Sequence, residues 1–95
     1  MYARVWFANT EPEKRDEIIQ VIRDSILPAI HQQQGYKGYL VLSDPSTGKG
    51  FVIALWETEA DLKASEAIGQ EQVAKAARFF TSAPVREVYE VLVQE

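Results

Sequence analysis

The stretch from Phe51 to Trp56 reads FVIALW and contains no polar residue. Successive side chains of a strand point to opposite faces of its sheet, so a strand with one face in water carries a polar residue at every second position. This stretch shows no such alternation. It therefore predicts a strand that is covered on both faces. The other segments of the chain indicate what covers each face.

Three further segments are rich in aromatic and β-branched residues, which is typical of strands. A turn-forming segment, SDPSTGKG, follows the second of them and predicts a hairpin into the stretch described above. The three segments are YARVWFA at 2–8, GYKGYLVLSD at 35–44 and VREVYEVLV at 85–93.

The segment between the first two predicted strands has a helical pattern. Isoleucine recurs every four residues from Ile18 to Ile30, which places one apolar stripe along a helix. Thr10 followed by Glu13 has the spacing of a capping box at its start. Pro28 lies inside the segment and predicts a kink or a restart, because proline removes a backbone donor.

A second helical segment follows the FVIALW strand. Thr58 and Asp61 predict its start, helical spacing covers 59–68, Gly69 is expected to interrupt it, and the pattern resumes over 70–80. The order of elements is then β-α-β-β-α-β. This order predicts an α+β, ferredoxin-like fold with a four-stranded antiparallel sheet, and both helical segments cover the same face.

The second face of the sheet is then left without a cover from the chain itself. Its strands are apolar at both parities, and an exposed apolar face of that size predicts a partner surface. We expect a homodimer in which two open sheet faces pack across a two-fold axis and form a barrel. The alternative is that the C-terminal strand or the long helix folds over the back of the sheet.

Length and composition narrow the class of protein. The 95 residues predict one domain spanning 1–95, and the net charge of −4 with scattered basic residues argues against nucleic acid as a partner. The absence of cysteine excludes disulfides and thiolate chemistry. We see neither an apolar run of ~20 residues nor a signal peptide, so we expect no membrane partner and a cytoplasmic location.

With these elements in place, the sequence resembles the antibiotic biosynthesis monooxygenase family of dimeric α/β barrel proteins. The resemblance rests on GYKGYLVLSDPSTGKGFVIALWETEADLKAS, on the closing VYEVLV, on the passage around Pro28 and on the junction from Trp56 to Thr58. It implies a pocket between helices and sheet in each subunit. The family includes cofactor-free monooxygenases acting on aromatic compounds, haem-degrading enzymes and quinol-handling enzymes.

The haem-degrading branch is disfavoured by the residues present. That branch uses an asparagine at the end of the first strand, a tryptophan on the helix after the third strand and a histidine that binds the haem. Asn9 matches the first position, but the aligned tryptophan and histidine positions fall near Ser65 and Arg78. Two of the three groups are therefore missing, and we expect no cofactor.

Three residues are candidate catalytic groups. The resemblance places Asn9 at the mouth of the pocket, where it would donate to a substrate oxygen, although an asparagine beside Thr10 also fits an ordinary turn. Tyr39 would supply a phenol hydrogen bond unless it only packs. His31 is the only histidine and the natural general base near neutral pH, but it lies at a polar helix end where a solvated histidine is ordinary.

Four further residues are candidate substrate-binding groups. Trp56 would stack on an aromatic ligand or act as a core anchor, and Tyr89 would hydrogen-bond or simply pack. Phe7 is included as an aromatic wall, and Arg78 would bind an anionic substituent or else face water. We predict no metal site, because His31 has no second histidine and no carboxylate within one helical turn.

The sequence therefore supports two functions of different classes. The first is a cofactor-independent monooxygenase, an oxidoreductase that oxidises a small aromatic or quinol substrate. The second is a non-catalytic, small-molecule-binding or stress-related dimer that keeps the same pocket. No residues have an unmistakable catalytic spacing, so the sequence leaves open whether the chain is an enzyme.

Overall fold

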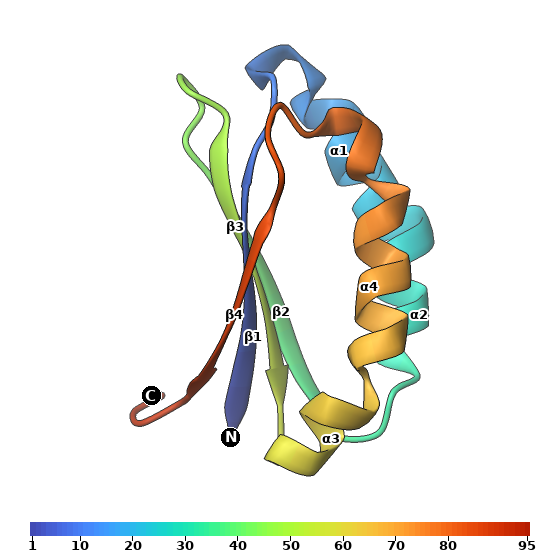
Figure 1. Ribbon diagram of the computed structural model, residues 1–95, viewed down its shortest axis with the longest axis vertical. Coiled ribbons are helices and arrows are strands. Elements are labelled where there is room, and N and C mark those ends of the chain that lie inside the picture. Colours follow the sequence, from blue (N-terminus) through green and yellow to red (C-terminus); the bar gives the residue numbers. More distant parts are fainter.

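The computed structural model describes residues 1–95 and contains one antiparallel sheet with helices on one side of it (Figure 1). The strands lie in the order β2-β3-β1-β4, so the two central strands are the first and the third in the chain. This confirms the predicted ferredoxin-like α+β fold. The strands are β1 (Tyr2–Asn9), β2 (Tyr36–Ser43), β3 (Lys49–Trp56) and β4 (Val85–Glu90).

The helical layer is built from short pieces joined end to end. Two groups of pieces run side by side along the same face of the sheet in Figure 1. The first group is η1 (Pro12–Lys14), α1 (Arg15–Val21), η2 (Ile22–Ile26) and α2 (Leu27–His31); the second is α3 (Glu59–Ala64), α4 (Glu66–Lys75) and η3 (Ala77–Phe79).

The first helical group differs from the sequence prediction at its start. Thr10 does not cap it, because the Thr10 backbone N–H and hydroxyl both donate to the carbonyl of Gly48 in the neighbouring hairpin. The helix begins two residues later, at Pro12. The predicted disturbance around Pro28 is present, because η2 is a π-helical turn just before the proline. A wide turn of this kind accommodates a position where the regular hydrogen bonds of an α-helix cannot form.

The second helical group is broken at Ser65 rather than at Gly69. Thr58 caps α3 as predicted, since its hydroxyl accepts a hydrogen bond of 3.0 Å from the Asp61 backbone N–H. Gly69 lies inside α4, so the expectation that it interrupts the helix is wrong. Its backbone helical geometry is regular, and the reason for a glycine there is a neighbouring side chain described below.

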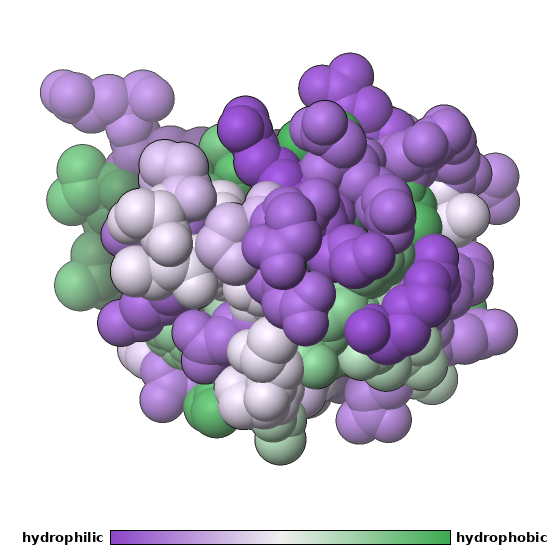
Figure 2. All heavy atoms as spheres, turned by 90° about the horizontal axis from the view of Figure 1, so that it is seen from above, coloured by the Kyte–Doolittle hydropathy of each residue, from purple (hydrophilic) through white to green (hydrophobic).

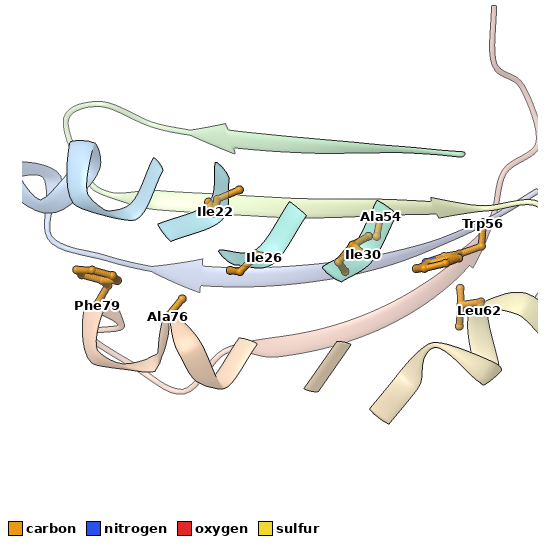
Figure 3. Packing of buried hydrophobic residues seen from close by; sticks show 8 residues of the cluster. All are labelled: Ile22, Ile26, Ile30, Ala54, Trp56, Leu62, Ala76 and Phe79. Atoms are coloured by element: carbon orange, nitrogen blue, oxygen red, sulfur yellow. The ribbon is translucent and has the colours of Figure 1, made fainter. Parts of the chain in front are cut away.

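The core lies between the helices and the sheet. Isoleucines of the predicted stripe pack onto β3 and onto the second helical group, and Trp56 is fully buried at one end (Figure 3). The cluster consists of Ile22, Ile26, Ile30, Ala54, Trp56, Leu62, Ala76 and Phe79.

The other face of the sheet is apolar and nothing in the chain covers it. Figure 1 shows no helix on this side. Strand β4 ends at Glu90, earlier than predicted, and the tail beyond it leaves Leu92 and Val93 more than 80% exposed (85% and 83%). The tail is therefore not the missing cover. Among the helices, none is long and apolar enough to cross a membrane.

Candidate functional site

The cavity between sheet and helices arises from a gradient of side-chain size along the sheet. At one end the helix-facing row contains Trp56, paired with Tyr2 on one side and Tyr36 on the other. At the other end the corresponding row is Ser43, Gly50 and Ala8. These small residues cannot fill the space under the helices, and a cavity of about 770 Å³ remains there.

The cavity reaches the end of the molecule where β1 leads into η1 and where the β2–β3 hairpin turns, because Thr10, Pro12, Pro45 and Gly48 line it, and we call this end its mouth. Hydrophilic residues cover most of that end when it is seen from above, with hydrophobic atoms visible between them (Figure 2). Of the 29 lining residues, 17 are hydrophobic, which gives the cavity a mainly apolar wall. The aromatic and aliphatic part of that wall includes Trp6, Ile19, Ile22, Ile26, Val52 and Val73.

Arg4 is a charged residue at the floor of this cavity, and it is only 2% exposed. It lies on β1 opposite Ala54. Its Nη1 donates to the Ser65 hydroxyl at 2.9 Å and to the Leu62 carbonyl at 3.5 Å. The guanidinium carbon also lies 5.4 Å from the centre of the Trp56 ring, within the range of a cation–π contact.

Gly69 explains how the helix accommodates this guanidinium. A Cβ atom at position 69 would lie 2.8 Å from Nη2 of Arg4 and 2.9 Å from its central carbon. Glycine is unfavourable inside a helix, so its presence in α4 needs a packing reason. The close approach of Arg4 supplies that reason.

The carboxylate of Glu66 lies near two arginines, Arg4 and Arg86, beside the cavity. Nε of Arg86 donates to Oε2 of Glu66 at 3.1 Å, and Nη2 of Arg86 pairs with Oε1. Arg4 is farther from the same group, with 3.9 Å between its Nη1 and Oε2 of Glu66. Glu66 is therefore hydrogen-bonded mainly to Arg86, and the cluster of three groups carries one net positive charge.

The protonation of the two polar groups near the floor follows from their burial. Burial lowers the pKa of Arg4 to about 10, and repulsion from Arg86 adds to this effect. Burial raises the pKa of Tyr39 to about 12, partly offset by the positive charge of Arg4. At neutral pH the cavity therefore presents a charged guanidinium and a neutral phenol.

Gln72 lies on the helical wall of the cavity with 4% of its surface exposed. Its Oε1 has no hydrogen-bond partner. The only other fully enclosed side-chain polar atom without a partner is Nε1 of Trp56, in the packed end. An unpaired buried acceptor is costly, and a ligand that donates to it would remove that cost.

Among the sequence candidates, Tyr39 is the one that lines the cavity. Asn9 follows Ala8 and precedes Thr10, both of which line it, but the Asn9 side chain is exposed and its Nδ2 donates to the Ser82 hydroxyl at 3.1 Å. Arg78 lies outside, over the ring of Phe79 at 4.4 Å. The geometry thus brings Tyr39 to the cavity and keeps Asn9 near its mouth.

His31 and Trp56 belong to the packed end of the layer. The His31 ring contacts Tyr36 with 4.9 Å between ring centres, and Tyr36 in turn meets Trp56 edge to face at 6.1 Å. Neither His31 nor Trp56 is among the residues lining the cavity. Trp56 has no exposed surface, and Leu62 packs beside it (Figure 3).

Phe7 and Tyr89 point to the open face of the sheet, away from the cavity. Phe7 packs edge to face on Phe51 with 5.0 Å between ring centres. Tyr89 is 49% exposed and its hydroxyl donates to the carboxylate of Glu87. These two aromatic residues therefore belong to the uncovered face of the sheet.

Arg4 and Gln72 were not identified from the sequence as site residues. For Arg4 a signal was present, because a charge in the middle of YARVWFA shares its parity with Trp6 and so points toward the helices. For Gln72 no local signal distinguishes it from Gln70 on the same helix. Across the whole chain, no three His, Asp or Glu side chains come together in a way that could hold a metal ion.

Fold and site together define a ferredoxin-like α+β domain with a mainly apolar cavity under its helices and an uncovered sheet face behind. The family model described as antibiotic biosynthesis monooxygenase matches residues 1–77. The chain belongs to this family, as the sequence resemblance indicated. None of the curated proteins matches the sequence.

Solved structures share the whole fold at low sequence identity. A proposed antibiotic biosynthesis monooxygenase from Caulobacter crescentus is 19% identical, with a TM-score of 0.76 over 97% of this chain and 90% of that one. One from Deinococcus radiodurans is 17% identical, with a TM-score of 0.76 over 100% and 96%. One from Nitrosomonas europaea is 19% identical, with a TM-score of 0.73 over 98% and 100%. At this identity the likeness concerns the fold.

Proposed function

We propose that the chain is a cofactor-independent monooxygenase that oxidises a small aromatic or quinol substrate inside the cavity. The observation that carries this proposal is the cavity itself, about 770 Å³ with a mainly hydrophobic lining and a few polar groups, which is the usual character of small-molecule sites. Family membership supplies the class of reaction.

Such a reaction requires few protein groups. An electron-rich phenol supplies the electrons, and O₂ reacts at the ring carbon opposite the hydroxyl. One oxygen atom becomes the second carbonyl of a quinone, and the other leaves as water with the ring hydrogen and the hydroxyl hydrogen. The site has to exclude water, orient the hydroxyl and stabilise the anion that forms when the proton leaves.

Tyr39 and Gln72 suit the task of orientation. With its pKa raised to about 12, Tyr39 remains protonated and donates a hydrogen bond to the substrate oxygen. Gln72, whose Oε1 is unpaired, accepts from a second hydroxyl after a small rotation of its amide. Asn9 stands next to the mouth and is proposed as a further donor once its contact with Ser82 opens.

Oxygen uptake with a panel of phenols and quinols tests this function. Tyr39→Phe keeps the ring and removes the donor, and we expect kcat/KM to fall roughly 10- to 100-fold, in the lower range for loss of one donor to a developing anion. Gln72→Leu is compared with Gln70→Leu, a matched change at an exposed position of the same helix, and Asn9→Ala tests the mouth. No uptake with any substrate, or full activity in Tyr39→Phe, would refute the assignment.

One observation favours the alternative of a binding protein without chemistry. Asp44 is the only carboxylate on the cavity lining, and the hydroxyl and backbone N–H of Ser46 both donate to it. These hydrogen bonds lower the pKa of Asp44, which makes it a weak proton acceptor. Tight binding of aromatic ligands without oxygen uptake would favour this second function.

We also propose that the open sheet face is the surface of a homodimer. Its residues form three rows across the four strands, in which Glu87 is the only charged member, and the pair of Asn9 and Lys49 lies beyond them at the hairpin end. The rows are Gly38–Leu55–Ala3–Tyr89, Leu40–Ile53–Val5–Glu87 and Leu42–Phe51–Phe7–Val85. A face of this size and polarity is well suited to a second copy of itself. Sedimentation that gives a monomer at micromolar concentration would refute it.

A further inference from the structure

The charges on the cavity wall have the opposite sign to the molecule as a whole. The chain carries a net charge of −4, yet the charged residues lining the cavity are three arginines and one aspartate. They are Arg4, Arg15, Arg23 and Asp44. Arg15 and Arg23 are exposed on the first helical group and take part in no ion pair. Positive charge concentrated around a cavity of an acidic protein points to an anionic ligand.

Arg4 is the main reason to expect an anionic ligand, because only one of its three nitrogens donates hydrogen bonds to the protein. All of them leave from Nη1, toward Ser65 and Leu62. Nε and Nη2 donate no hydrogen bond to the protein, and neither belongs to the fully enclosed unpaired atoms. These two nitrogens form one edge of the planar guanidinium. An edge of this kind binds a carboxylate through two parallel hydrogen bonds.

The neighbouring groups leave the charge of Arg4 available. Glu66 is hydrogen-bonded by Arg86 and lies 3.9 Å from Arg4, so it does not neutralise both arginines. Gly69 provides the space beside Nη2 that any larger residue would occupy. Tyr39 also lines the cavity, and the positive charge of Arg4 partly offsets the rise in the pKa of its hydroxyl that burial causes. A buried cation with a free edge, next to an open cavity, is the arrangement of a ligand-binding group.

We propose that the cavity binds an aromatic acid, with the ligand carboxylate on Nε and Nη2 of Arg4 and the ring against the apolar wall. Arg15 and Arg23 attract the acid from the mouth. This specifies the substrate class of the proposed monooxygenase and rests on the same cavity. The binding itself does not require that any oxidation occurs.

The test compares probes that differ in charge and share one ring system. Binding of 2-naphthoate, 2-naphthamide and 2-naphthol is measured by isothermal titration calorimetry at neutral pH and low salt. We expect 2-naphthoate to bind at least tenfold more tightly than the amide, the scale of a charge-assisted pair. Equal affinities for 2-naphthoate and 2-naphthamide would overturn the proposal, and so would tighter binding of the neutral 2-naphthol than of 2-naphthoate.

Single substitutions test which residues hold the carboxylate of 2-naphthoate. Arg4→Met should remove the preference for 2-naphthoate over the amide. Gly69→Ala keeps the charge but places a Cβ against both Nη2 and Nε of Arg4, and it should weaken 2-naphthoate binding at least roughly fivefold by crowding the edge that holds the carboxylate. Arg23→Gln should weaken it by roughly two- to threefold at low salt and less at high salt. Lys63→Gln, outside the cavity, is the control for an exposed lost charge. Unchanged 2-naphthoate affinity in both Arg4→Met and Gly69→Ala would overturn the proposal.

Failure of this inference is distinguishable from failure of the proposed function. Tight, Arg4-dependent binding of 2-naphthoate without oxygen uptake from any phenol or quinol supports the acid site and refutes the monooxygenase. Oxygen uptake with neutral quinols, together with equal binding of 2-naphthoate and 2-naphthamide, supports the monooxygenase and refutes the acid site.

Discussion

Replacing Arg4 with methionine tests whether its guanidinium serves to bind a ligand or to stabilise the fold. Burial lowers the pKa of Arg4 by about 2.5 units, to about 10, so the folded state disfavours the charged form. At about 1.4 kcal/mol per pH unit the difference amounts to at most ~3.5 kcal/mol, and partial solvent screening reduces it to about 2 kcal/mol. Because the folded pKa lies below the unfolded one, this penalty is complete below pH 10 and disappears as the pH rises toward 12.5.

Methionine removes that penalty and also removes the favourable contacts of the guanidinium with Ser65, Leu62 and Trp56, of which the hydrogen bond to Ser65 is the shortest. The hydrogen bond from Arg4 to the Ser65 hydroxyl is worth about 1.5 to 3 kcal/mol as a bond from a charged donor. The unbranched methionine side chain still fills the space along β1, and Glu66 keeps its pairing with Arg86. The terms nearly cancel, and we expect the free energy of unfolding of Arg4→Met to lie within about 1 kcal/mol of the wild type.

Urea denaturation followed by circular dichroism measures this difference. Protein concentration is held fixed, because dissociation of a dimer would contribute to the apparent stability. If Arg4 instead held the fold together through Glu66, its removal would cost about 3 to 5 kcal/mol, as for the breaking of a buried ion pair. A loss of that size with an unchanged m-value would refute the view that Arg4 is kept for a ligand.

Three further predictions concern the sheet face, the buried phenol and a helix cap. Leu42→Glu on the open face should give a monomer in sedimentation velocity, whereas Gln70→Glu on the exposed side of α4 should leave the assembly unchanged. The pKa of about 12 for Tyr39 lies above the value of about 10 in the unfolded chain, so the contribution of Tyr39 to stability is lost between pH 10 and 12 as the unfolded state ionises first. Loss of charge on Arg4 acts in the opposite direction over this range, so the wild type is compared with Tyr39→Phe: from pH 9 to pH 11, urea denaturation should show the wild type losing about 1 kcal/mol relative to the variant. Thr58→Ala removes the acceptor for the Asp61 N–H and should cost about 1 kcal/mol in the same assay, and no loss would contradict the capping role.

The fold was predictable because hydrophobic parity is a property of each strand alone. FVIALW is apolar at both parities whatever lies around it, and in the structure one set of its side chains meets the helices while the other remains on the open face. Boundaries were less predictable because they depend on neighbours. Thr10 bonds to Gly48 in a hairpin far along the chain, and the glycine at position 69 leaves space for Arg4 and does not mark a helix end.

The site was harder to predict because a cavity is defined by what several elements fail to fill. Tyr39 was identified through its phenol group and does line the cavity. His31 and Trp56 carry suitable chemistry too, but they lie at the packed end, and no feature of their own sequence neighbourhoods says which end will be hollow. The roles predicted for them, as for Asn9, Phe7, Tyr89 and Arg78, remain predictions.

The position of Arg4 along the sheet connects the size gradient with the proposed chemistry. Its row, with Ala54 and Tyr39 on the neighbouring strands, follows the packed row of Trp56 and precedes the wider part of the cavity. A ligand that enters at the mouth therefore meets the apolar wall along its length and the guanidinium only at its inner end. In the proposed complex the acid group would fix how deep the ring sits, so that the same ring position would be presented to oxygen in every binding event. In this arrangement an anionic group remote from the reacting carbon supplies binding energy that orients it, which is how positioning lowers a barrier without a dedicated catalytic base.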